Sequence, residues 1–171
     1  QPLNEQFEIV KEDYYKENGG IIFPNPNAPT GALLPLSAIE DVVKHNPDSV
    51  VIVDEAYIDF GGESAMPLID RYDNLLVVQT FSKSRSMAGM RIGYAMGNEQ
   101  LIKYLSDVKY SFNSYTMNAT AIALGTAAMR DRAYFEETKA KIIATRERAK
   151  ERLAALGFSF VDSRANFIFA A

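Results

Sequence analysis

The sequence predicts an α/β fold in which helices flank a mostly parallel sheet. Short apolar runs alternate with longer segments in the N-terminal half, at a spacing typical of a doubly wound sheet. The run at 49–53 is almost entirely β-branched, as in strands that are buried on both faces of a parallel sheet. Polar clusters follow three of these runs, at the sheet edge where open α/β sheets bind ligands.

The first expected elements lie before residue 48. Residues 21–23 predict a short buried strand that enters a rigid loop at 24–31, because the prolines and asparagines of this loop cannot continue a strand or a helix. Ser37 is the expected N-cap of the next helix. That helix should end near Asn46, where Pro47 closes it.

Three further strands are expected in the first half of the chain. The run at 49–53 leads directly into Asp54, and a short helix at about 65–72 follows. Residues 75–79 predict the next buried strand. Residues 91–97 predict a strand that returns from the Ser-rich loop after it.

The C-terminal half changes character and is mainly helical. Helices are expected at about 99–107, 117–129 and 132–156, and the last has one charged face. At about 1.5 Å per residue the last helix would span nearly 40 Å, which is enough to bridge two domains. We therefore expect it to be a long linking helix.

The end of the chain predicts a second domain that is incomplete. Gly157 should end the long helix, and the aromatic segments at 158–161 and 166–169 predict the first strands of a small α+β domain. We expect residues 1–150 to form the central part of a large domain and 151–171 to begin the small one. The chain lacks an initial methionine and stops within an expected strand, so we expect a fragment.

The composition excludes several classes of function. The 171 residues carry a net charge of -4 and offer no basic stripe for nucleic acid. No apolar run approaches the roughly 20 residues of a membrane span, so a cytoplasmic protein is the default. The absence of cysteine and the single histidine, His45, exclude thiolate catalysis and cysteine or histidine-cluster metal sites. We expect His45 to be solvated at a helix end, and no metal.

The polar clusters around Asn27, Asp54 and Lys83 should meet in one crevice, since each follows a sheet strand. A ligand for this set must use an amine, a carboxylate, a phenol, hydroxyls and an arginine. Pyridoxal phosphate meets each demand. It has an aldehyde for Lys83, a pyridine nitrogen for Asp54, a phenolic oxygen for Tyr57 and Asn27, and a phosphate for the hydroxyls and Arg91.

Each of these features alone has a simpler explanation. The Ser-rich stretch at 80–91 could be a surface loop, and Asp54 could be a strand end that enters solvent. Arg91 could be a surface ion-pair partner, and Asn27 could be a turn residue. The joint placement at strand ends favours a site over these separate explanations.

Three blocks of the chain carry a family resemblance. Residues 24–31 (PNPNAPTG), 54–60 (DEAYIDF) and 80–89 (TFSKSRSMAG) match, in order and spacing, the motifs of the fold-type I pyridoxal-phosphate aminotransferases, which the chain resembles. Weaker similarity at 109–113 and 164–167 extends the match over nearly the whole chain. Within the family, the chain is most similar to enzymes that exchange an amino group between histidinol phosphate and 2-oxoglutarate in histidine biosynthesis.

The resemblance implies three catalytic residues. Lys83 would form the Schiff base with the cofactor and, once the substrate has freed its amine, would move the proton between the substrate Cα and the cofactor C4′. Asp54 would keep the pyridine nitrogen protonated. Tyr57 would donate to the phenolic oxygen and so tune the pKa of the Schiff base.

The resemblance also implies a phosphate site. Thr80, Ser82 and Arg91 would hold the phosphate, the arginine by a bidentate contact. Many members carry asparagine directly before the Pro-Thr-Gly, but Ala28 occupies that position here. Either Asn27 supplies the contact to the phenolic oxygen or this contact is weakened.

The expected function is therefore aminotransfer between small-molecule amino acids and oxo acids, in a full-length protein that is a homodimer. The fragment alone is expected to be inactive, because the family's phosphate loop and its substrate-carboxylate arginine lie outside it. A decarboxylase of a phosphorylated amino acid would share all three blocks. A non-catalytic α/β module that binds another phosphate ligand is the third hypothesis.

Overall fold

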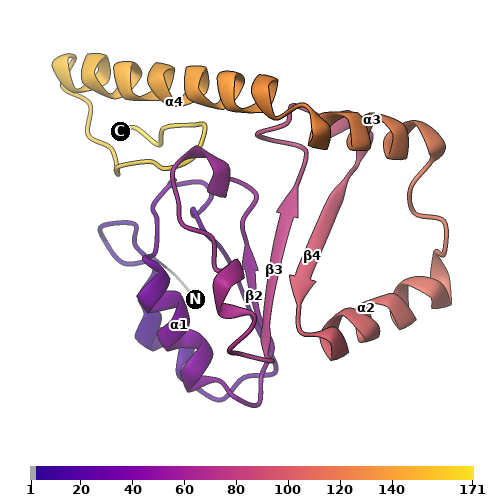
Figure 1. Ribbon diagram of the computed structural model, residues 1–171. Helices are drawn as coiled ribbons and strands as arrows, with labels where there is room; N and C mark the ends of the chain where they lie inside the picture. Colours follow the sequence, from indigo (N-terminus) through magenta and orange to yellow (C-terminus); the bar gives the residue numbers. More distant parts are fainter. Residues whose placement is uncertain (1–2) are drawn as a thin grey trace.

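A computed structural model describes residues 3–171 and contains one four-stranded sheet. The strands lie in the order β1-β2-β3-β4 (Figure 1). The first two pairings are parallel and the third is antiparallel, which confirms the expected mostly parallel α/β fold. The strands are β1 (Ile21–Pro24), β2 (Val51–Asp54), β3 (Leu75–Thr80) and β4 (Gly93–Gly97).

The register of the sheet brings the ends of three strands together. Pro24 of β1 pairs with Asp54 of β2, and Asp54 in turn pairs with Val78 of β3. The antiparallel pair places Thr80 opposite Gly93, so the loop between them starts and ends at neighbouring positions. The three loops that carry the predicted site residues therefore leave the sheet side by side.

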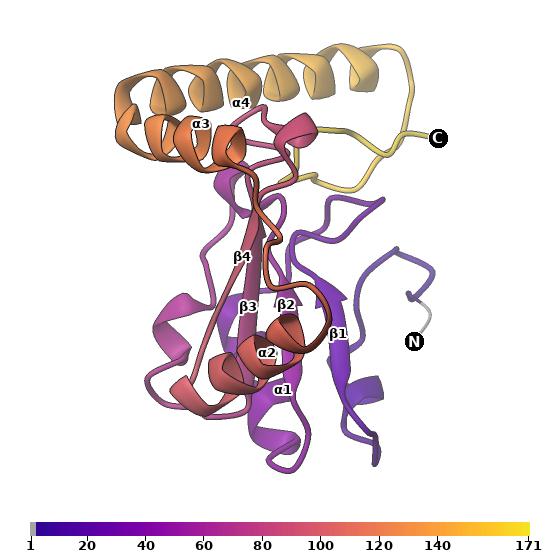
Figure 2. The ribbon, with the colours of Figure 1, turned by 90° about the vertical axis from the view of Figure 1, so that its right-hand side faces the viewer.

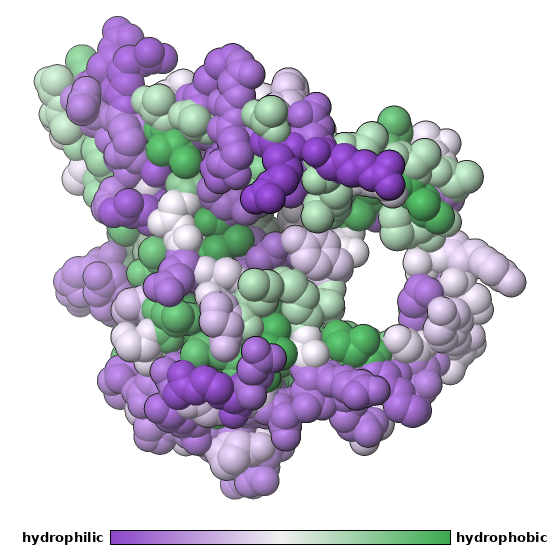
Figure 3. Space-filling model, viewed as in Figure 1, coloured by the Kyte–Doolittle hydropathy of each residue, from purple (hydrophilic) through white to green (hydrophobic). Residues whose placement is uncertain are grey.

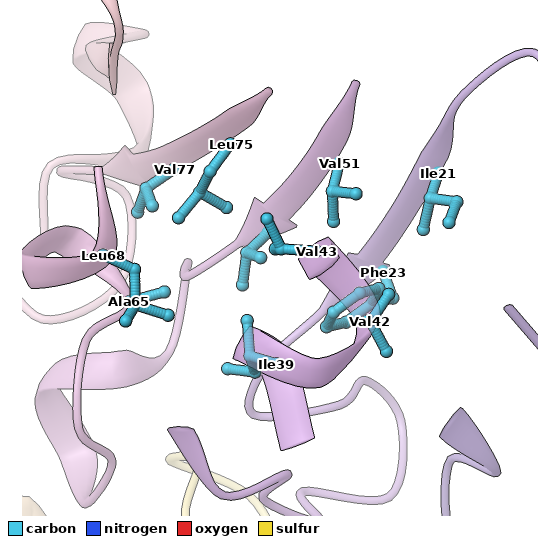
Figure 4. Packing of buried hydrophobic residues seen from close by; sticks show 11 residues of the cluster. Ile21, Phe23, Ile39, Val42, Val43, Val51, Ala65, Leu68, Leu75 and Val77 are labelled. Carbon is cyan, nitrogen blue, oxygen red and sulfur yellow. The ribbon is translucent and has the colours of Figure 1, made fainter. Parts of the chain in front are cut away.

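The main core lies on one face of the sheet. Alternate residues of β1, β2 and β3 point to this face, where α1 (Leu36–His45) packs against them (Figure 4). Ile39, Val42 and Val43 of α1 are at most 1% exposed. Each such side chain contributes about 1.5–3 kcal/mol when it is fully buried. The helix therefore holds the strand register in place.

The opposite face is less covered than the sequence predicted. Ile22 is 68% exposed and Ile52 is half-buried, so the expectation of buried strands at 21–23 and 49–53 holds for one face only. The segment η3 (Met66–Leu68) joins α1 in the same core. Within residues 3–171, the connections of β1, β2 and β3 thus pack on a single face, and the expected double winding is not found.

Two local expectations about helices were wrong. Pro35, not Ser37, is the N-cap residue of α1, and no side chain caps the helix there. The helix expected at 65–72 is a single 3₁₀ turn, η3, followed by turns that lead into β3. Because an isolated helix this short is marginal, burial of Leu68 and not helix propensity determines the local structure.

Three helices follow the sheet, and the helix predictions at 117–129 and 132–156 are confirmed within two residues. The helix expected at 99–107 continues to residue 112. Each helix has an Asn or Asp side chain as its N-cap. No helix of the described chain is both long and apolar enough to cross a membrane. The helices are α2 (Glu99–Phe112), α3 (Ala119–Arg130) and α4 (Arg132–Ala155).

The helices α3 and α4 lie beyond the end of β3, whereas α2 lies near the opposite end of the sheet (Figures 1 and 2). No residue of α2 is buried, and the space-filling view shows an opening between α2, α3 and the sheet (Figure 3). Tyr104, Leu105 and Val108 of α2 are large apolar side chains that are 45–60% exposed. An apolar surface of this kind is typical of a contact with further protein.

The C-terminal segment differs from the prediction. Gly157 follows α4 with a φ of 87°, as expected for a helix end. The strands expected at 158–161 and 166–169 are absent from the described residues, where a single bridge joins Phe160 and Ala170. This segment folds back onto the loops after β1 and β2. The helix α4 crosses residue 150, and the division into two domains remains a prediction.

Candidate functional site

The structure brings Lys83 and Tyr57 together. Lys83 follows β3 and Tyr57 follows β2, and the Lys83 amine lies over the Tyr57 ring, 5.1 Å from its centroid. Both residues are half-buried. An amine and a phenol from neighbouring strand ends therefore face a common space.

Asp54 is the last residue of β2 and is also half-buried. Its Oδ1 accepts a hydrogen bond of 3.0 Å from the backbone N–H of Ala56. This bond fixes the carboxylate at the point where the chain leaves the sheet, between the ends of β1 and β3.

The neighbouring Glu55 has a different role, which the sequence reasoning did not assign. It is 1% exposed and accepts hydrogen bonds from Ser64 Oγ, the Ala65 N–H and Gln79 Nε2, at 2.6–2.8 Å. Burial raises the pKa of the Glu55 carboxyl, and the three donors act in the opposite direction. The strand alternation could have identified it, since Asp54 and Glu55 must point to opposite faces.

The loop after β3 is held by its own hydroxyl groups. The hydroxyl oxygens of Thr80 and Ser82 lie 2.9 Å apart, and the Ser82 N–H donates to Thr80 Oγ1. Ser84 is 3% exposed and donates to the Asp59 carboxylate at 2.5 Å, which links the Lys83 loop to the Tyr57 loop. The hydroxyl pair at Thr80 and Ser82 could bind an anion.

Arg91 does not join this hydroxyl pair. Its guanidinium is exposed and donates to the carbonyl of Ala88 at 2.8 Å, and its backbone is left-handed with a φ of 54°. No hydrogen bond in the described chain joins Arg91 to Thr80 or Ser82. The bidentate contact expected of Arg91 would need a different side-chain rotamer.

Asn27 is also occupied within its own loop. Its side chain is 5% exposed and its Nδ2 donates to Thr30 Oγ1 at 2.7 Å. Asn25, which the sequence reasoning did not select, is fully buried and bonds both the N–H and the carbonyl of Leu34. The two asparagines hold the loop together, while Ala28 is exposed.

The C-terminal segment that follows Gly157 contacts two of the three loops, namely those after β1 and β2. The Arg164 N–H donates to the Gly31 carbonyl at 2.8 Å. The Phe167 ring meets the Tyr57 ring edge to face, with centroids 5.1 Å apart. Sequence reasoning missed this role of Phe167, because nothing in a local pattern indicates a contact over such a distance in the chain.

A cavity of about 660 Å³ opens beside the site, between the loops and the C-terminal segment. Ala32, Gly61 and Arg164 are among its lining residues, whereas Asp54, Tyr57 and Lys83 do not line it. The structure thus places Lys83 beside Tyr57 and Thr80 beside Ser82. The side chains of Asn27 and Arg91 instead make hydrogen bonds within their own segments.

Known proteins are similar to this chain in sequence and fold. The family model "Aminotransferase class I and II" matches residues 4–171. A histidinol-phosphate aminotransferase of Pseudomonas putida (strain W619) is 61% identical over 168 residues, which cover 98% of this chain and 48% of that protein. The chain thus spans about half the length of the curated relatives it matches.

Two solved structures have the same fold. A histidinol-phosphate aminotransferase from Sinorhizobium meliloti in complex with pyridoxal-5'-phosphate matches with a TM-score of 0.79 at 26% identity, over 89% of this chain and 42% of the other. A decarboxylase from Sulfurospirillum multivorans matches with a TM-score of 0.84 at 27% identity, over 99% and 52%. Because the family model spans nearly the whole sequence, this chain belongs to the class I and II aminotransferase family.

Proposed function

We propose that this chain provides the lysine-bearing part of a pyridoxal-phosphate-dependent aminotransferase. The observation that carries the proposal is the Lys83 amine, 5.1 Å from the centre of the Tyr57 ring, at the ends of two neighbouring strands. Asp54 ends one of these strands and the Thr80 and Ser82 hydroxyls follow the other. An amine, a carboxylate, a phenol and a hydroxyl pair fit the functional groups of this cofactor.

Lys83 would hold the cofactor and act as the base of the reaction. When bound, pyridoxal phosphate supplies an aldehyde that condenses with amines and a ring that accepts the electrons left on the substrate carbon. The Lys83 amine would take the proton from the substrate Cα and later return a proton.

Asp54 and Tyr57 would tune the cofactor from two sides. The Asp54 carboxylate, anchored by the Ala56 N–H, would hold a proton on the pyridine nitrogen. The Tyr57 hydroxyl would donate to the phenolic oxygen. Thr80 and Ser82 would bind the phosphate, and Arg91 would join them after a rotamer change. Asn27 would act indirectly, by holding its loop.

For the substrates, we propose histidinol phosphate and 2-oxoglutarate. The support is the relative that is 61% identical over nearly the whole chain. That relative is about twice as long, so the activity belongs to the full-length protein. We also propose that this protein is a cytoplasmic homodimer. The exposed apolar residues of α2 support a chain that packs against more protein.

The decarboxylase of Sulfurospirillum multivorans favours a second candidate function, because it has the same fold at a similar identity. The two reactions have different products. Incubation of the full-length protein with histidinol phosphate should consume 2-oxoglutarate, whereas release of carbon dioxide from a phosphorylated amino acid would support the decarboxylase.

Borohydride reduction tests the cofactor and its attachment together. The protein with pyridoxal phosphate should show a visible absorbance band that borohydride removes, and peptide mapping should place the pyridoxyl group on Lys83. A stable protein without such a band would support a non-catalytic phosphate-binding module. Lys83→Ala should abolish amino transfer, and an unchanged rate would contradict the mechanism.

A further inference from the structure

Arg146 is a cation on α4 that is almost fully buried. Its side chain is 5% exposed, and one nitrogen, Nη1, donates to two backbone carbonyls: Phe60 O at 2.8 Å and Ala165 O at 2.9 Å. Glu147 pairs with the guanidinium at 2.7 Å. A guanidinium is costly to bury unless such partners satisfy it. A cation that only served solubility would not be placed here.

The two carbonyls belong to segments that end beside the same tyrosine. Phe60 closes the 3₁₀ turn η2 (Ile58–Phe60), and its N–H donates to the Tyr57 carbonyl at 3.1 Å. Ala165 is fully buried and lies two residues before Phe167. Phe167 in turn packs edge-on against the Tyr57 ring, with an interplanar angle of 88°. Arg146 therefore fixes both the backbone that carries Tyr57 and the ring that packs against it.

We propose that Arg146 is a positioning residue that sets the orientation of the Tyr57 phenol toward the cofactor. This inference rests on the proposed function. Arg146 is linked to Tyr57 in two ways, through the Phe60 carbonyl and through the Ala165 carbonyl, whose segment carries Phe167. The Tyr57 ring also faces the Lys83 amine. Arg146 itself has no contact with Lys83 among the described hydrogen bonds, so it acts through Tyr57.

Arginine is suited to this role and lysine is not. One planar guanidinium donates to both carbonyls and to Glu147 at once, with its nitrogens in a fixed fork. A lysine ammonium could keep the charge but would need to reach all three acceptors from one atom. Arg146→Lys should therefore preserve the ion pair and loosen one of the two carbonyl contacts.

The test is a spectroscopic pH titration of the full-length protein with bound pyridoxal phosphate. When Tyr57 donates to the phenolic oxygen of the cofactor, this oxygen holds the proton on the neighbouring Schiff-base nitrogen less firmly. The pKa of the chromophore is therefore lower when this hydrogen bond is present. Tyr57→Phe should raise this pKa and serves as the reference. Arg146→Lys should raise the chromophore pKa as well, which corresponds to a proton affinity of the chromophore about three- to tenfold higher. The cofactor should also dissociate faster from this variant.

Two variants of other basic residues on α4 show whether any such substitution alters the titration. Arg148 is exposed, so Arg148→Lys should leave the titration unchanged. Lys150 is 9% exposed and binds Asp162 and also Glu147, the carboxylate that pairs with Arg146. No hydrogen bond of the described residues joins it to Phe60 or Ala165. Lys150→Met should lower the thermal midpoint without moving the chromophore pKa. A purely structural role for Arg146 would give this same pattern.

The outcomes separate the inference from the proposed function. If the unsubstituted protein forms no chromophore with pyridoxal phosphate, the proposed function fails. If the chromophore forms and Tyr57→Phe shifts its pKa, but Arg146→Lys titrates like Arg148→Lys, the positioning role is wrong. If Arg146→Lys does not fold, Phe167→Leu, which removes the ring contact alone, must shift the pKa in the direction of Tyr57→Phe.

Discussion

Gly31→Ala should destabilise the protein by moving the C-terminal segment off the first loop. Gly31 has a φ of 77°, and a Cβ there would lie 2.1 Å from Ser163 Oγ and 3.0 Å from the Ser163 Cα. Ser163 is fully buried and cannot move aside alone. The segment 162–167 must therefore shift, and the hydrogen bond from the Arg164 N–H to the Gly31 carbonyl must stretch.

The size of this effect follows from three contributions. The left-handed backbone costs an alanine about 1–2 kcal/mol. The lost hydrogen bond contributes about 0.5–1.5 kcal/mol, and a weakened Phe167–Tyr57 contact contributes up to about 1.5 kcal/mol. The free energy of unfolding should therefore fall by about 1.5–5 kcal/mol. The upper value is a bound, because the three contributions involve one segment and need not add.

Urea denaturation measures this loss as a lower midpoint at unchanged slope. Gly89→Ala is the matched control, because nothing lies within 4 Å of the added Cβ. Ser163→Gly in the Gly31→Ala background removes the two shortest contacts and should recover part of the loss. A Gly31→Ala protein within about 0.5 kcal/mol of the unsubstituted one would refute the reasoning.

Substitutions at three further positions test the core and the charges. Because Ile39 is fully buried, Ile39→Ala should lower the free energy of unfolding by about 2–5 kcal/mol and Ile39→Val by about 0.5–1.5 kcal/mol. Equal losses for the two variants in urea denaturation would contradict the tight packing at Ile39. Burial raises the pKa of Glu55 in the folded protein. Its contribution to stability is therefore present below the pKa of Glu55 in the unfolded chain and is lost as pH rises through its pKa in the folded protein. Glu55→Gln should flatten this part of the curve of stability against pH. The Lys150 hydrogen bond lowers the pKa of Asp162, so its contribution is present above the unfolded pKa and is lost as pH falls through the folded one. Because Asp162 is 64% exposed, Asp162→Asn should cost at most about 1 kcal/mol near neutral pH and nothing in strong acid, as thermal melts at the two pH values can show.

The sequence was most informative where a pattern is local. The β-branched run before Asp54 and the apolar run after Asn74 identified β2 and β3, because strand propensity and burial agree there. The parallel arrangement then brought Asp54, Tyr57 and Lys83 to one edge of the sheet. Clusters at strand ends are predictable because the edge itself follows from the connections.

The errors concern features that depend on distant contacts. The segment 158–169 has a strand-like composition, but its buried residues Ser163 and Ala165 pack on Gly31 and Arg146 and not in a sheet. The contact of Asn27 with a ligand is a different case and stays a prediction. Its amide donates to Thr30 in the structure, and a polar side chain of this kind is compatible with either role.

The pairing of Thr80 with Gly93 determines when the entropy of ordering the Lys83 loop is lost. Its two ends are neighbours in the sheet, so the entropy of loop closure is lost when the protein folds and not when a ligand arrives. Ser84 fastens the middle of the loop to Asp59. A ligand at Lys83 therefore meets an amine whose backbone is already ordered, and little of its binding free energy goes into ordering it.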